Sequence, residues 1–202
     1  MQKIALVTGA SSGIGRGFAY ELAKAEYSLV LVARRETRLR EIKENIEQQY
    51  GVSVEYVVAD LGSLEAAREV FLHYKRIDLL INAAGIGNMG DIADLSLEQE
   101  QKMIDLNVKS LQYLTSVYGR EMAKRNAGSI INVASTSAFA AFPNFAVYAA
   151  TKAFVLSYTE AVSKELEAMN VMLWHCAQGQ LTPSFLMWKR RKYCKEGQAI
   201  CH

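Results

Sequence analysis

The sequence predicts an α/β protein in which a doubly wound parallel sheet of six strands carries helices on both faces. Short uncharged apolar runs alternate along the chain with stretches whose apolar residues recur at helical spacing. This alternation favours parallel strands that are joined by right-handed helical crossovers. A glycine-rich turn follows the first apolar run, and the 202 residues, 50% of them hydrophobic, are enough to bury one large core. We therefore expect a single Rossmann-like domain over residues 1–202.

The first four strands are predicted from apolar runs, which cover residues 4–7, 29–33, 52–59 and 78–81. A helix is expected after the glycine turn, because an amphipathic stretch begins there at once. A second helix follows the second strand and is expected to end at Gly51, since glycine commonly closes helices. Ser63 is the expected N-cap of the third helix, because its hydroxyl can accept a bond from a backbone N–H.

The second half of the chain adds two strands and two long helices. Ser96 and Gln99 have the spacing of a capping box, which predicts a helix from residue 97 to about residue 124. The other expected elements are strands over residues 129–134 and 171–176 and a helix over residues 149–169. In such a sheet, ligands bind at the carboxyl ends of the strands, near the point where the strand order reverses.

The turn after the first strand has the composition of a phosphate-binding loop. Its glycines permit positive φ and close approach of a ligand, and its serines offer donors ahead of a helix. The spacing, Gly-x-x-x-Gly-x-Gly, is wider than the usual dinucleotide fingerprint, and a serine-rich hairpin turn is the alternative. Because an amphipathic helix follows, we expect a dinucleotide pyrophosphate here. The predicted cofactor-binding residues of the turn are Gly9, Ser11, Ser12, Gly13, Ile14 and Gly15.

Two arginines follow the second strand, where a dinucleotide-binding fold recognises the adenosine ribose. Arg34 and Arg35 suit a 2′-phosphate by charge and by bidentate geometry, whereas an acid there would bind the 2′-hydroxyl of NAD. NADP is therefore the predicted cofactor. Two alternatives stay open, namely that the arginines only form a solvated helix start, or that Glu36 reaches the ribose.

Two more segments lie at the ends of strands. Asp60 follows the third strand, from where its carboxylate can accept from an adenine amino group, and the alternative is that it caps a turn. The fourth strand ends in small side chains, which would let a cofactor lie close against the backbone. These residues are Asn82, Ala83, Ala84 and Gly85.

A tyrosine and a lysine four residues apart carry the predicted chemistry. Tyr148 and Lys152 lie on one helix face, within about 6 Å. A phenol titrates near pH 10, so it exchanges protons poorly at neutrality unless a cation stabilises the phenolate, as Lys152 can. The spacing alone is weak, since Tyr20 and Lys24 share it on a helix surface. Ser135, just past the fifth strand, distinguishes the second pair, because the intervening loop can bring its hydroxyl beside Tyr148.

Together these motifs resemble the short-chain dehydrogenase/reductase family of nicotinamide-dependent oxidoreductases, over about residues 3–176. The resemblance implies that the segment from Thr8 to Gly15 binds the coenzyme and that Asp60 and Leu61 form the adenine site. The segment from Asn82 to Gly85 is similar to the family's Asn-Asn-Ala-Gly motif, with Ala83 replacing the second asparagine. The implied catalytic residues are Asn107, Ser135, Tyr148 and Lys152.

The resemblance also implies a role for each of these four residues. Tyr148 would protonate the carbonyl oxygen as hydride arrives from C4 of the nicotinamide, and Ser135 would hold that oxygen in place. Lys152 would lower the pKa of the phenol and bind the nicotinamide ribose, and Asn107 would position a water that relays protons. Asn107 is a mediocre helix former inside the long predicted helix, which is consistent with such a role.

The end of the chain departs from the family pattern. Ala177 and Gln178 stand where the family usually has Pro-Gly, although Thr182 is still expected to reach the nicotinamide carboxamide. Relatives usually continue into a seventh strand, which we do not expect here, so residues 178–202 are predicted to be an atypical and mobile segment. The basic run over residues 189–195 is interpreted as a solvated face rather than a nucleic-acid site.

Charge and composition exclude several classes of function. With 23 basic and 21 acidic residues the net charge is +2, so no strong field would attract nucleic acid or a membrane surface. No apolar run is long enough to span a bilayer, and we expect a cytoplasmic protein. Cys176, Cys194 and Cys201 lack Cys-x-x-Cys spacing, which indicates neither a disulfide framework nor a metal site.

We therefore predict an NADP(H)-dependent reductase or dehydrogenase that transfers hydride between the nicotinamide and the carbonyl or secondary alcohol of a small or medium apolar substrate. The apolar loop over residues 138–145 favours an apolar pocket wall, with core packing as the alternative. The alternative function is an NADP-binding regulatory module with little turnover, which the absent seventh strand favours. The resemblance also implies a homodimer through the helices that carry Asn107 and Tyr148.

Overall fold

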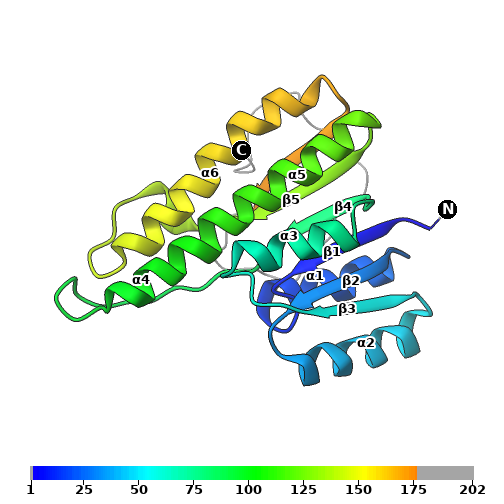
Figure 1. Cartoon of the computed structure of the whole chain (residues 1–202), viewed down its shortest axis with the longest axis horizontal. Helices are drawn as coiled ribbons and strands as arrows, with labels where there is room; N and C mark the ends of the chain where they lie inside the picture. The colour runs from blue at the N-terminus through cyan, green and yellow to red at the C-terminus, as the bar shows by residue number, and fades with distance from the viewer. Residues whose placement is uncertain (1, 177–202) are drawn as a thin grey trace.

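The computed structural model describes residues 2–176, and Figure 1 shows how their helices and strands are arranged. Six strands form one parallel sheet in the order β3-β2-β1-β4-β5-β6. The strand order reverses between β1 and β4, and the predicted doubly wound fold is confirmed. The predictions for Ala177, Gln178, Thr182, the basic run and the last two cysteines lie outside the described residues.

Every predicted strand is present, and the third is shorter than predicted at both ends. The strands are β1 (Ile4–Thr8), β2 (Ser28–Ala33), β3 (Val54–Val58), β4 (Leu79–Asn82), β5 (Gly128–Val133) and β6 (Val171–Cys176). The α-helices are α1 (Gly13–Lys24), α2 (Glu36–Tyr50), α3 (Leu64–His73), α4 (Leu97–Ile104), α5 (Leu111–Lys124) and α6 (Ala146–Glu167). A short 3₁₀ turn, Thr136–Phe139, follows β5.

Alternate residues of the strands build two apolar cores, one on each face of the sheet. Val7 and Leu31 face helices α1 and α2, and Leu6, Leu80 and Ile130 face helices α3, α5 and α6 (Figure 1). These five side chains are fully buried. Burial of each one contributes about 2 kcal/mol of hydrophobic free energy, so the two cores fix the register of the strand ends that build the site.

The ends of the helices follow the predicted signals. Gly51 ends α2 with φ 67°, and Ser63 accepts a bond from the N–H of Ala66 at the start of α3. Ser96 likewise accepts from the N–H of Gln99, but the Gln99 side chain accepts from Asn88 Nδ2 at 2.9 Å. Only the serine half of the predicted capping box is therefore observed.

The predicted helix from residue 97 to about residue 124 is interrupted. A π-helical turn, Asp105–Ser110, separates α4 from α5 and buries Asn107 and Ser110. Both side chains bond to neighbouring loops, because Ser110 Oγ donates to the carbonyl of Leu61 and Asn107 pairs with the backbone of Ile86. The wider π turn lets both polar side chains reach these partners. The apolar spacing of the sequence predicted an uninterrupted helix and therefore did not indicate the turn.

Within residues 2–176, no helix is long and apolar enough to cross a lipid bilayer. The same part of the chain holds no group of three or more His, Cys, Asp or Glu side chains arranged to bind a metal ion.

Candidate active site

The glycine turn lies at the carboxyl end of β1, directly against the end of β4. Gly9 has φ 66°, and a Cβ added to it would lie 2.8 Å from the carbonyl oxygen of Ala83. The Thr8 hydroxyl closes the same junction, because its Oγ1 accepts from the N–H groups of Ala83 and Ala84 at 3.0 and 3.1 Å and donates to the carbonyl of Ile81. The ends of β1 and β4 therefore form one connected floor.

Helix α1 starts from this floor. Ser12 is its N-cap, and the Ser12 side chain makes no capping bond to the first turn. A Cβ on Gly15 would lie 2.5 Å from the carbonyl oxygen of Gly9, so only glycine lets the helix begin so close to the strand. Ile14 stands in the first turn beside Gly13, whose φ is 53°. The N–H groups of this turn point toward the carboxyl edge of the sheet, as an anion site requires.

Of the two predicted arginines, Arg35 reaches the glycine turn. Its Nε and Nη2 donate to Ser11 Oγ at 3.3 and 3.1 Å, and Nη2 also donates to the Ser11 carbonyl at 3.3 Å. Arg34 is exposed beside it. The guanidinium of Arg35 is thereby fixed beside the predicted pyrophosphate turn.

Both predicted adenine-site residues, Asp60 and Leu61, make contacts within the protein. The Asp60 carboxylate accepts from the N–H of Gly62 at 3.0 Å, which is the turn-capping alternative. Leu61 is only 4% exposed and packs in the core below α3 and α5. Asn82, which begins the segment whose backbone was predicted to lie close to the cofactor, is 3% exposed, and its side chain points into the protein.

Asn82 belongs to a buried polar network that the sequence did not predict. Its Nδ2 donates to Asn132 Oδ1 at 2.9 Å and to Thr115 Oγ1 at 3.1 Å, and Asn132 Nδ2 donates to Thr159 Oγ1 at 3.0 Å. These four residues come from β4, β5, α5 and α6. Asn132 is a polar residue inside a predicted apolar strand, and that was the available signal.

Asn107 lies beneath the loop that leaves β4. Its Oδ1 accepts from the N–H of Ile86 at 3.0 Å, and its Nδ2 donates to the Ile86 carbonyl at 2.8 Å and to Thr151 Oγ1 at 3.1 Å. A Cβ on Gly85 would lie 3.1 Å from Asn107 Oδ1 and 3.5 Å from Lys152 Nζ. Two of the predicted catalytic residues therefore meet at Gly85.

Tyr148 and Lys152 lie on the first turns of α6. Lys152 Nζ is 5.8 Å from the centre of the Tyr148 ring and donates to the carbonyl of Val133 at 2.8 Å. Lys152 is only 6% exposed, and this burial lowers the pKa of its ammonium to about 8. The Tyr148 ring packs on Phe145, with ring centres 4.6 Å apart, and against the backbone of Gly87.

Ser135 stands two residues beyond the end of β5 and caps the 3₁₀ turn. It is 5% exposed, and its Oγ accepts from the N–H of Ser137 and pairs with Ser137 Oγ, both at 3.2 Å. Val133, the acceptor for Lys152, lies two residues before it. The hydrogen bond from Lys152 to Val133 therefore ties the backbone just before Ser135 to α6, the helix that carries Tyr148.

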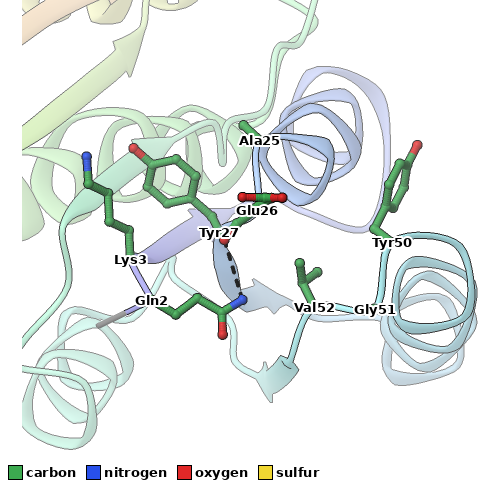
Figure 2. Close-up of a pocket in the computed structure, with 8 residues that line it drawn as sticks. All are labelled: Gln2, Lys3, Ala25, Glu26, Tyr27, Tyr50, Gly51 and Val52. Atoms are coloured by element: carbon green, nitrogen blue, oxygen red, sulfur yellow. Dashed lines mark hydrogen bonds between the residues drawn. The ribbon is translucent and has the colours of Figure 1, made fainter.

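A separate hollow of about 560 Å³ opens at the opposite edge of the sheet. Figure 2 shows its lining residues, which precede β1, β2 and β3 or end α1 and α2. Gln2 Nε2 donates to the Glu26 carbonyl across it at 3.4 Å. None of the predicted site residues within 2–176 lines this hollow, so it is not the candidate active site.

The family model for short chain dehydrogenases matches residues 3–193 of the chain. The match extends past residue 176, where the resemblance was predicted to end. A 7β-hydroxysteroid dehydrogenase of Mediterraneibacter gnavus is 33% identical over 184 residues, which cover 90% of this chain and 70% of that protein.

Solved structures agree with the sequence comparison. A short-chain dehydrogenase from Sphingobium yanoikuyae in complex with NADPH superposes with a TM-score of 0.82 and 33% identity, covering 86% of this chain and 69% of that one. A bulky-bulky ketone specific alcohol dehydrogenase from Comamonas testosteroni gives a TM-score of 0.83 at 30% identity, with coverages of 87% and 71%.

Proposed function

The chain belongs to the short-chain dehydrogenase family, and we propose that it is an NADP(H)-dependent oxidoreductase that acts on the carbonyl or secondary alcohol of an apolar substrate. The observation that carries the proposal is the meeting of Asn107, Lys152 and Tyr148 around Gly85 and Gly87, at the end of β4. Sequence spacing alone predicted the pairing of Tyr148 with Lys152, and the contact of Asn107 with the loop after β4 adds support from a distant segment.

The residues at the carboxyl edge fit a dinucleotide. The floor at Gly9 and Ala83 leaves no space for a Cβ, and the start of α1 presents N–H groups without a side-chain cap, which suits a pyrophosphate. Arg35 is the proposed ligand of a 2′-phosphate, because it is exposed and already oriented by Ser11. The NADPH complex of the Sphingobium yanoikuyae relative supports the same preference.

The bound cofactor would supply or accept the hydride. Tyr148 is the proposed proton donor to the carbonyl oxygen, and Ser135 the proposed hydrogen-bond partner of that oxygen. Lys152, held by Val133, would stabilise the phenolate, and it already lies within 5.8 Å of the Tyr148 ring. Asn107 is the proposed link in proton relay, through the Ile86 and Thr151 groups that it contacts.

Two loops next to Tyr148 favour an apolar substrate. The N–H of Gly90 donates to the carbonyl of Asn144 at 2.9 Å, which joins the loop after β4 to the loop before α6. These loops expose four large apolar side chains. They are Met89 at 77%, Ile92 at 86%, Phe139 at 54% and Phe142 at 45% exposure. We propose a ketone of medium or large apolar bulk, larger than the small or medium substrate predicted from the sequence, and the named substrates of the ketone and hydroxysteroid relatives support it.

The alternative, an NADP-binding regulatory module with little turnover, is not favoured. All four proposed catalytic residues are present, and three of them converge on the β4 loop. One domain, a cytoplasmic location and a homodimer through α4–α5 and α6 remain proposals of the same kind.

The proposed function is tested by Tyr148→Phe. With NADPH and a panel of apolar ketones, we expect turnover to fall by at least about 100-fold, because the proton donor is lost, while NADPH binding persists. Tyr20→Phe is the matched control, since Tyr20 has the same spacing to Lys24 on α1 and should leave turnover unchanged. Equal turnover in Tyr148→Phe and the unaltered protein would refute the proposal.

A further inference from the structure

A tyrosine on β3 holds the one acidic side chain at the start of α2. The Tyr56 hydroxyl donates to Glu36 Oε1 at 3.3 Å. Tyr56 packs with the core under α1 and α2, and Glu36 is the first residue of α2, directly after Arg35. Glu36 is therefore the nearest carboxylate in sequence to the two arginines, and it is attached to the side of the sheet that α2 covers.

The position of this carboxylate bears on cofactor choice. A carboxylate beside the adenosine ribose accepts from the 2′-hydroxyl of NADH and repels the 2′-phosphate of NADPH. A released Glu36 would also have Arg35 beside it, and pairing with that guanidinium would remove a phosphate ligand. The hydrogen bond from Tyr56 and the positive end of the α2 dipole both keep the carboxylate at the helix start.

We propose that Tyr56 is a positioning residue for cofactor specificity, an inference that rests on the proposed function. Its hydroxyl keeps the Glu36 carboxylate away from the ribose and from Arg35. Arg35 attracts the 2′-phosphate, and Tyr56 removes the competing acid. Tyr56 acts through Glu36 and does not itself contact the cofactor.

The test measures the dissociation constants of NADPH and NADH by calorimetric titration. Tyr56→Phe keeps the packed ring and removes only the hydroxyl, so we expect the ratio of the NADH constant to the NADPH constant to fall about fivefold. Adding Glu36→Gln to that variant should restore the ratio, since the acceptor charge is gone. Glu36→Gln alone should change the ratio by less than about twofold, because the carboxylate is already withheld.

The chain provides a matched control. Tyr74 donates to Glu55 Oε2 at 2.8 Å. This is a second tyrosine–glutamate hydrogen bond, and its glutamate is the neighbour of Tyr56 in β3. Successive strand residues face opposite sides of the sheet, and this pair lies away from α2. Tyr74→Phe should leave the ratio unchanged.

The outcomes separate the two proposals. If the unaltered protein binds neither nucleotide, the proposed function fails. If it binds NADPH but Tyr56→Phe keeps the original ratio, or if Glu36→Gln alone raises the ratio about fivefold or more, the role of Tyr56 is wrong.

Discussion

Burial of the Lys152 ammonium imposes an electrostatic cost on the folded protein. The ammonium is buried and donates to the carbonyl of Val133, and burial lowers its pKa from 10.5 to about 8. Below pH 8 the folded state holds a charge that the unfolded chain solvates better. Stability against unfolding is therefore reduced at neutral pH, and it recovers as the pH rises from 8 toward 10.5.

This cost predicts a pH-dependent difference between the unaltered protein and Lys152→Met. From pH 7.5 to pH 9.5 the free energy of unfolding of the unaltered protein should rise by about 2 kcal/mol relative to the variant, because only the lysine sheds its buried proton. Urea unfolding of both proteins at the two pH values measures the difference. Parallel changes in the two proteins would show that Lys152 is charged at no cost.

At the scale of elements, the buried network around Asn132 joins two strands to two helices. Asn132 makes hydrogen bonds with Asn82 of β4, Thr115 of α5 and Thr159 of α6. Helix α6 also carries Tyr148 and Lys152, so the network sets the distance between that helix and the ends of β4 and β5. A polar network of this kind fixes position more strictly than apolar packing does.

Asn132→Leu should lower the free energy of unfolding by about 2–4 kcal/mol, since three buried polar groups lose a partner. Asn45→Leu, on the exposed side of α2, is the control and should change it by less than about 0.5 kcal/mol. Chemical denaturation of both variants provides the measurement. Similar stabilities would mean that the network contributes nothing net.

Sequence reasoning predicted the elements better than their interruptions. Apolar runs predicted all six strands, because a parallel strand that is buried on both faces consists almost entirely of apolar residues. The π turn at Asn107 was missed, since it depends on partners, Ile86 and Thr151, that only the fold brings near. For the same reason the pattern could not decide between the cofactor and the turn for Asp60, and it could not show that Asn82 faces inward.

At the scale of the whole molecule, α6 presents an aromatic pair to solvent. Phe154 is 38% exposed and stacks on Tyr158 at 5.5 Å, and Tyr158 pairs with Ser116 of α5. A partly exposed aromatic pair on α6 that also contacts α5 suits a second copy of the same face. This supports the proposed homodimer through α5 and α6.

Light scattering should therefore give twice the chain mass of 22.5 kDa. Phe154→Glu should give the single mass, because a charge would be buried at the interface. Leu72→Glu replaces a 59% exposed apolar residue on α3 and should keep the double mass. A single mass for the unaltered protein would exclude the homodimer at the concentration measured.

The Thr8 hydroxyl has a consequence for how any ligand at this crevice is bound. One oxygen bridges β1 to the chain leaving β4, and it does so through three hydrogen bonds within the protein. Folding alone therefore fixes the junction between the ends of β1 and β4, where the two halves of the sheet meet. A ligand that lies across it meets a preorganised surface, so the entropy of ordering that surface has been lost before association and does not weaken the affinity.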